Sequence, residues 1–213
     1  MTIRLSSRHR FLALAILFEG GLGVAAGVAG YLTGNPPLAT VRQGGASARE
    51  TLMALAVGIT AAVPMVAGLL LVDRCPIEPL RQLREFVDAY VVPLFVSFSA
   101  IQLLLLSLAA GVGEEMLFRG LMQAGVARWL GPPLGTILGL VLASFAFGIC
   151  HWLTATYAVL ATAVGLYLGC LFLVTDNLLA PIAAHATYDF LALMYLVRGW
   201  RDRQPAVVGT PQE

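Results

Sequence analysis

Two adjacent glutamates, Glu114 and Glu115, lie in a stretch of sequence that is otherwise apolar. On a helix, residues four apart share a face, while neighbours point about 100° apart. Glu115 can therefore pair with Arg119, whereas Glu114 points away from this arginine and keeps a free carboxylate. A free carboxylate can take a proton from water, as in a hydrolysis. An ion pair that only joins helices is the alternative role for Glu115 and Arg119.

Two of the three histidines also lie at or within apolar runs, each with a residue four positions away on the same helix face. Phe147 precedes His151, and Asp189 follows His185. A carboxylate beside a histidine can fix the tautomer or the charge of its ring. A neutral imidazole can hold an attacking water in line. The second histidine and its aspartate can stabilise an oxyanion. For either histidine alone, the alternative is a hydrogen bond to a neighbouring helix.

The same side chains offer ligands for a metal ion. A zinc site would use Glu114, His151 and His185. The HExxH pattern of zinc-protease helices does not occur in the sequence, so the ligands would have to come from three helices. Serine chemistry has weaker support, because GxSxG is also absent. We expect no cofactor, with zinc as the alternative.

Another carboxylate, Glu19, lies inside the first apolar run, directly before Gly20 and Gly21. A glutamate within a membrane span needs a partner or a hydrated cavity. Glu19 therefore either pairs with an arginine or a backbone group, or faces the cavity that holds the other candidate residues.

A bilayer is the environment that suits this composition. Of the 213 residues, 59% are hydrophobic and 12% are charged, against roughly 25% charged residues in soluble domains. Because each crossing takes about 20 apolar residues, we predict an all-α, polytopic transmembrane bundle of about six to eight helices. The net charge of +1 indicates no nucleic-acid partner. We expect the bilayer and a protein or peptide substrate as partners, and no feature of the sequence sets an oligomeric state.

Hydropathy divides the chain into a basic N-terminus (1–10), a transmembrane domain (11–198) with its motif-bearing core at 91–196, and a polar tail (199–213). Apolar runs predict seven crossings, at about 11–32, 51–72, 90–110, 111–130, 134–150, 154–174 and 180–197. Arginines gather in the N-terminus, in the segment 73–88 and in the tail. The positive-inside rule places all three in the cytoplasm. Seven crossings would separate the two ends, so one crossing must be incomplete or misplaced, with the fourth and fifth as suspects.

The candidate residues resemble the CPBP intramembrane proteases, which include type II CAAX prenyl endopeptidases and bacterial proteins linked to bacteriocin processing and self-immunity. Three motifs carry the resemblance: EExxxR at 114–119, FxxxH at 147–151, and HxxxN or HxxxD at 185–189. Each motif alone is weak. All three occur here in order, each on an apolar run, within about 91–196.

The resemblance implies roles for the matching positions. Glu114 and His151 would activate the water, and His185 with Asp189 would form the oxyanion site. The remaining motif residues, Glu115, Arg119 and Phe147, would support the arrangement. Asp189 stands where the prenyl endopeptidases have Asn, and an ionised Asp cannot donate a hydrogen bond to an oxyanion. Asp189 would therefore carry a proton or act through His185. The resemblance favours a reaction without a metal.

These observations predict an intramembrane endopeptidase of a prokaryotic inner membrane, multi-pass, with a cytoplasmic N-terminus. Its substrate would be a membrane-associated protein or peptide, including a lipidated one. The alternatives are a zinc-dependent protease using the same groups, and a non-catalytic membrane scaffold or proton-relaying carrier.

Overall fold

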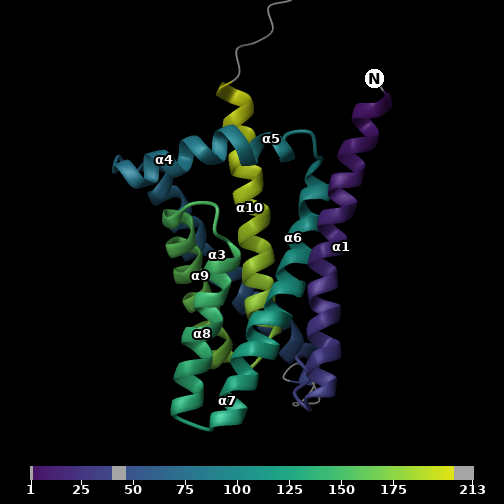
Figure 1. Cartoon of the computed structure of the whole chain (residues 1–213), viewed down its shortest axis with the longest axis vertical. Coiled ribbons are helices and arrows are strands. Elements are labelled where there is room, and N and C mark those ends of the chain that lie inside the picture. The colour runs from purple at the N-terminus through teal and green to yellow at the C-terminus, as the bar shows by residue number, and fades with distance from the viewer. Residues whose placement is uncertain (1, 40–46, 204–213) are drawn as a thin grey trace, which may run out of the picture.

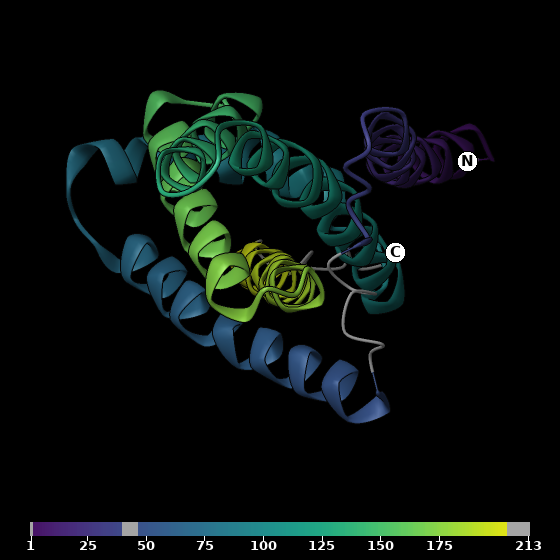
Figure 2. The same ribbon diagram turned by 90° about the horizontal axis from the view of Figure 1, so that it is seen from below.

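The computed structural model describes residues 2–39 and 47–203, and it is entirely helical in this part of the chain (Figures 1 and 2). The α-helices are α1 (Thr2–Leu32), α3 (Ala48–Arg74), α4 (Glu78–Phe86), α5 (Val92–Phe95), α6 (Ala100–Glu115), α7 (Ala124–Leu130), α8 (Leu134–Cys150), α9 (Ala155–Thr175) and α10 (Leu179–Arg203). Two stretches are π-helical, η1 (Val87–Val91) and η2 (Met116–Gln123). The predicted all-α class is confirmed.

Five helices of the described chain are long and apolar enough to cross a membrane: Ser7–Leu32, Ala48–Arg74, Ala100–Leu130, Ala155–Thr175 and Leu179–Arg203. Helix α8 is apolar but shorter, with 17 residues. Large apolar side chains such as Leu17, Val63 and Val159 are exposed on the outside of the bundle, where a bilayer would cover them. The chain is a multi-pass membrane protein.

The predicted third and fourth crossings are wrong. Residues 90–110 do not form one helix, because the chain leaves helical structure after Phe95 and a new helix begins at Ala100. A reciprocal pair of hydrogen bonds caps this start. Ser99 Oγ accepts from the Gln102 N–H at 3.4 Å, and Gln102 Oε1 accepts from the Ser99 N–H at 2.9 Å. From Ala100 the helix continues through η2 to Leu130, so 111–130 is not a separate crossing.

Because 100–130 is one helix, the predicted number of crossings no longer conflicts with the placement of both arginine-bearing ends on the same side of the membrane. With α8 counted, six helices of the described chain traverse the bundle. The N-terminal end of α1, helix α4 and the C-terminal end of α10 consequently lie at the same end of the molecule (Figure 1). Helices α1 and α10 extend into the predicted N-terminal segment and tail. Residues 40–46 of the first loop and 204–213 of the tail lie outside the described residues.

Small residues determine how closely the helices approach one another. A Cβ on Gly113 would overlap the Glu19 carbonyl oxygen, so α6 touches α1 there. A Cβ on Gly111 would lie 2.9 Å from the Ala186 Cβ, where α6 meets α10. Close backbone approach at small residues is the usual device for packing membrane helices. Helix α10 packs against α3, α6 and α9, and Figure 2 shows it in the interior of the bundle, with α1 at the periphery.

Candidate functional site

The residues predicted from sequence come from four parts of the chain. Glu19 is on α1, Glu114 and Glu115 end α6, Arg119 is in η2, Phe147 and His151 are at the C-terminal end of α8, and His185 and Asp189 are on α10. The structure brings all eight residues into one interior cluster, as the contacts below show.

Glu115 and Arg119 form the buried base of this cluster. Arg119 Nη1 donates to Glu115 Oε1 at 2.8 Å, and both side chains are almost completely buried. Arg119 Nη2 donates to the Gly165 carbonyl oxygen on α9 at 2.9 Å, and its Cζ lies 4.8 Å from the Phe147 ring centroid. The ion pair predicted from the spacing is present, and it links α6, η2, α8 and α9.

His185 is held between two carboxylates. Its Nδ1 lies 2.8 Å from Glu115 Oε1, and its Nε2 lies 3.4 Å from Asp189 Oδ2. An ionised carboxylate only accepts hydrogen bonds, so Nδ1 donates to Glu115, while Nε2 lies within ion-pair distance of Asp189. The edge of the Phe147 ring packs against this imidazole, with centroids 5.8 Å apart. These contacts connect α10 with α6.

Glu114 and His151 face each other beside this base. Glu114 Oε2 is buried and has no hydrogen-bond partner among the described residues, and it lies 3.6 Å from His151 Nε2. His151 Nδ1 lies 2.8 Å from the Phe147 carbonyl oxygen. Because a carbonyl only accepts, Nδ1 carries the hydrogen and the neutral ring presents a lone pair at Nε2 towards Glu114. The 3.6 Å separation is too long for a direct hydrogen bond and suits two acceptors that share a water.

The connection between α8 and α9 positions His151. Helix α8 ends at this residue, whose ring stacks on Phe147 with centroids 4.3 Å apart. Helix α9 begins at the N-cap Thr154, whose Oγ1 accepts from the Tyr157 N–H at 3.1 Å. The Tyr157 ring centroid lies 6.3 Å from that of His151, and the hydroxyl interacts electrostatically with Asp189 and Glu114. Sequence reasoning missed Tyr157, which carries no motif and lies in an apolar run.

Glu19 lies next to Glu114. The contact between α1 and α6 at Gly113 involves the Glu19 backbone, and Gly113 directly precedes Glu114. The Glu19 side chain interacts with Glu114 and with the charges of Asp189 and His185. Its Oε2 is buried without a hydrogen-bond partner in the described ranges. The α1–α6 contact thus places Glu19 beside the helix turn that carries Glu114.

The zinc alternative requires Glu114, His151 and His185 to converge on one ion. No three His, Cys, Asp or Glu side chains of the described residues are arranged to hold a metal. Both ring nitrogens of His185 face carboxylates, and His151 Nδ1 faces a carbonyl. Only Glu114 and one His151 nitrogen remain available, which is fewer than the three protein ligands of a catalytic zinc site. Glu114, His151 and His185 as arranged therefore do not converge on one ion.

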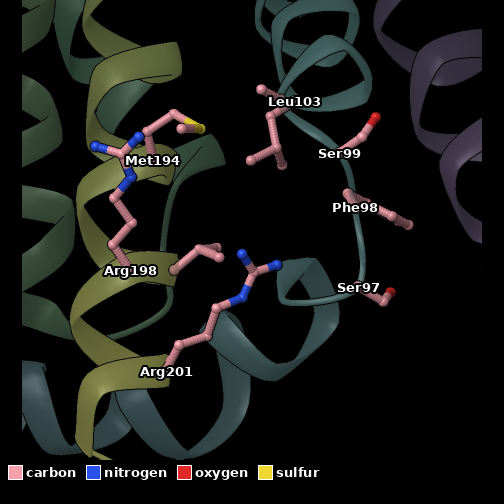
Figure 3. Close-up of a pocket in the computed structure, with 9 residues that line it drawn as sticks. Ser97, Phe98, Ser99, Leu103, Met194, Arg198 and Arg201 are labelled. Atoms are coloured by element: carbon pink, nitrogen blue, oxygen red, sulfur yellow. The ribbon is translucent and has the colours of Figure 1, made fainter.

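A separate cavity of about 370 Å³ opens between α6 and α10, at the end of the bundle where α4 lies (Figure 3). It is lined by Ser97, Phe98, Ser99, Ala100, Leu103, Met194, Val197, Arg198 and Arg201. Arg201 reaches across the gap and donates to the Val96 carbonyl oxygen. None of the eight candidate residues lines this cavity.

Comparison with known families places the candidate site within one matched segment. The family model for type II CAAX prenyl endopeptidase Rce1-like proteins matches residues 96–191. This segment contains all three motifs and every predicted site residue except Glu19. Comparison with curated proteins and comparison with solved structures each give no match. The predicted resemblance is confirmed: the helices that carry the candidate site match the type II CAAX prenyl endopeptidase Rce1-like family.

Proposed function

We propose that this chain is an intramembrane endopeptidase that hydrolyses a peptide bond of a membrane-associated protein or peptide with water activated by Glu114 and His151. One observation carries the proposal: the unpartnered Oε2 of Glu114 faces the lone pair of His151 Nε2 across 3.6 Å. The match to a family of endopeptidases supports the type of reaction.

The two acceptors define how the water would react. The water donates one hydrogen bond to His151 Nε2 and the other to the Glu114 carboxylate, and its oxygen lone pair points at the substrate carbonyl carbon. As the carbon–oxygen bond forms, Glu114 takes the proton. When the carbon–nitrogen bond breaks, Glu114 returns this proton to the leaving nitrogen. The products are a carboxylic acid and an amine, and Glu114 is again ionised.

His185 and Asp189 would stabilise the tetrahedral intermediate. A protonated His185 would place positive charge next to the reacting carbonyl, and an opposite charge stabilises a developing oxyanion. Asp189 cannot donate while ionised. In this proposal it acts through His185, whose Nε2 it holds at 3.4 Å.

The decisive variants are Glu114→Gln and His151→Phe, with Glu85→Gln as the matched control, because Glu85 is exposed and pairs with Arg81 on the surface of α4. The assay uses a farnesylated CAAX peptide with a fluorophore and a quencher. It is combined with comparative proteomics of membranes from wild-type and Glu114→Ala cells, which names the natural substrate. Each site variant should lose about 10²–10⁴-fold in cleavage and keep the wild-type melting temperature. Normal cleavage by purified Glu114→Gln protein refutes the proposal.

The same variant addresses the non-catalytic alternative. A membrane scaffold does not need the Glu114 charge for chemistry. Rescue of a deletion strain by the Glu114→Gln form would therefore indicate a scaffold, whereas failure of this form at normal protein level supports catalysis.

We propose further that the reaction needs no metal, on the strength of the donor set described above. Metal analysis of the purified protein and a chelator titration test this point. Cleavage that survives 1,10-phenanthroline supports it. A stoichiometric zinc whose removal abolishes cleavage contradicts it.

Glu19 belongs to the same proposed site, because its carboxyl group interacts with Glu114. Glu19→Gln should lower cleavage more than it lowers the amount of folded protein. Wild-type turnover by this variant would rule out a role in the reaction.

We propose that the protein resides in a prokaryotic inner membrane with its N-terminus in the cytoplasm. Three arginine-bearing regions lie at one end of the bundle: the start of α1, the segment around α4 and the end of α10. The positive-inside rule favours the cytoplasm for this end. A green fluorescent protein fused after the last residue should fluoresce, and alkaline phosphatase fused there should be inactive. The opposite pair of results would overturn this orientation.

A further inference from the structure

The proposed hydrolysis needs a hydrogen-bond donor for the oxyanion of the tetrahedral intermediate. None of the residues predicted from sequence offers a donor that is free for this role. His185 Nδ1 shares a hydrogen bond with Glu115 Oε1 at 2.8 Å, and its Nε2 lies 3.4 Å from the Asp189 carboxylate. The Asp189 carboxylate accepts hydrogen bonds but does not donate them. The charge on His185 can attract an oxyanion, but a directed donor has to come from another side chain.

Tyr157 has such a donor. Its hydroxyl makes no hydrogen bond to any residue in the ranges 2–39 and 47–203. The side chain is half-buried, and its ring lies 6.3 Å from the His151 ring, centroid to centroid. The hydroxyl interacts electrostatically with Asp189 and Glu114, which belong to α10 and α6. The Tyr157 ring therefore lies close to His151, and its hydroxyl is within electrostatic range of the other groups that would surround the scissile bond.

The position of Tyr157 relative to His151 is fixed by the local fold. The Leu153 N–H donates to the His151 carbonyl oxygen at 2.8 Å, and Thr154 caps the helix turn that carries Tyr157. Helices α8 and α9 also pack tightly next to this connection. A Cβ added to Gly148 on α8 would lie only 2.7 Å from the Ala158 carbonyl oxygen on α9. A donor that is held in place needs little reorganisation during the reaction, which is the condition for effective oxyanion stabilisation.

We infer that Tyr157 is a catalytic residue whose hydroxyl donates a hydrogen bond to the oxyanion of the tetrahedral intermediate. The inference rests on the proposed function and adds a residue to it. Tyr188 is the competing hydroxyl near the site, and it interacts with Asp189, whereas Tyr157 interacts with both Asp189 and Glu114. Tyr157 is thus the tyrosine near both the water-activating carboxylate and the α10 motif.

The test is Tyr157→Phe, which removes the hydroxyl and keeps the ring. Loss of one oxyanion donor should lower kcat about 10²–10³-fold and leave KM nearly unchanged. The matched control is Tyr167→Phe on the same helix, whose hydroxyl donates to the Ala61 carbonyl oxygen at 2.8 Å, away from the site. This control should keep the wild-type kcat. Unchanged kcat in Tyr157→Phe, or a loss confined to KM, overturns the inference.

A rescue experiment separates donation from packing. Asp189→Asn places an amide N–H₂ donor next to His185 while keeping an oxygen that accepts from its ring. In the Tyr157→Phe background, Asp189→Asn should restore kcat at least about tenfold, because a neutral donor again faces the oxyanion. A double variant as slow as Tyr157→Phe contradicts the assigned role.

The probe is the farnesylated, fluorescence-quenched CAAX peptide with full-length protein in proteoliposomes. If that peptide stays intact, the probe is the membrane protein that accumulates in Glu114→Ala cells. An inactive Glu114→Gln protein beside a fully active Tyr157→Phe protein refutes only the role of Tyr157. A fully active Glu114→Gln protein refutes the proposed function, and the inference with it.

Discussion

Arg119 is fully buried, and its guanidinium joins Glu115, the Gly165 carbonyl oxygen and the Phe147 ring. Arg119→Met keeps an unbranched side chain of similar reach and removes the charge. Glu115 would then be left inside the protein and would keep, of its two partners described above, the His185 imidazole. The variant therefore tests whether this ion pair holds together the helices that carry the site.

The expected cost follows from the burial of the pair. Removing one member of a buried ion pair leaves an uncompensated charge and costs about 3–5 kcal/mol. Since each 1.4 kcal/mol is a factor of ten, the unfolding equilibrium constant should rise about 10²–10⁴-fold. The lost hydrogen bond to Gly165 belongs to the same perturbation and is not added separately.

Reversible unfolding of the purified protein in mixed micelles, followed by circular dichroism, measures this change. Arg81→Met is the control, because Arg81 pairs with Glu78 and Glu85 on the exposed surface of α4, and its loss should change the free energy of unfolding far less than Arg119→Met does. The double variant with Glu115→Gln should recover at least about half of the loss, since it removes the isolated charge and keeps an oxygen for His185.

Two results would refute this reasoning. One is an Arg119→Met protein within about 1 kcal/mol of the wild type, which is the range of a surface pair. The other is a double variant less stable than Arg119→Met alone, which would show that the Glu115 charge stabilises the fold even without its arginine.

Two further predictions concern α1 and α4. Gly113→Ala should lower the free energy of unfolding by about 1–3 kcal/mol and reduce cleavage, because the added methyl group overlaps the Glu19 carbonyl oxygen. Gly20→Ala is the control and should change neither quantity, because the space around its Cβ is open. Equal cleavage and equal melting temperatures for the two variants would contradict the tight contact. Arg81 holds the pKa of Glu78 below its ordinary value of 4.5, so the pair stabilises α4 above the ordinary pKa and loses this effect as pH falls through the lowered value. A spin label on α4 should become more mobile as the pH falls through the lowered pKa of Glu78. Arg81→Gln should abolish this pH dependence, and a label whose mobility responds to neither change would contradict the prediction.

The sequence was most informative where the relevant geometry is local. The pairing of Glu115 with Arg119 follows from a spacing of four on one helix, and the structure contains it at 2.8 Å. The same rule placed Glu114 away from the arginine, and its Oε2 has no hydrogen-bond partner among the described residues. The approach of Glu114, His151 and His185 from three helices could be expected only through the family resemblance, because no local rule fixes how distant helices cross.

The start of the helix at Ala100 has a sequence signal that the hydropathy of the third predicted crossing obscured. Ser99 and Gln102 have the spacing of a capping box, yet the surrounding residues are apolar enough to look like one continuous span. Tyr157 gave no comparable signal. Its importance arises from the short connection after His151 and from its distance to groups on α6 and α10, both of which are properties of the tertiary structure.

Helix α8 has 17 residues and is therefore about 25 Å long, less than the roughly 30 Å of a bilayer's hydrocarbon core. Its connection to α9 ends below the level reached by α1 and α10 (Figure 1). A hydrophobic segment that is too short draws the bilayer in around it. We therefore expect the bilayer to be thinner over the connection that carries His151, which would bring headgroups and water closer to the residues where the proposed hydrolysis consumes water.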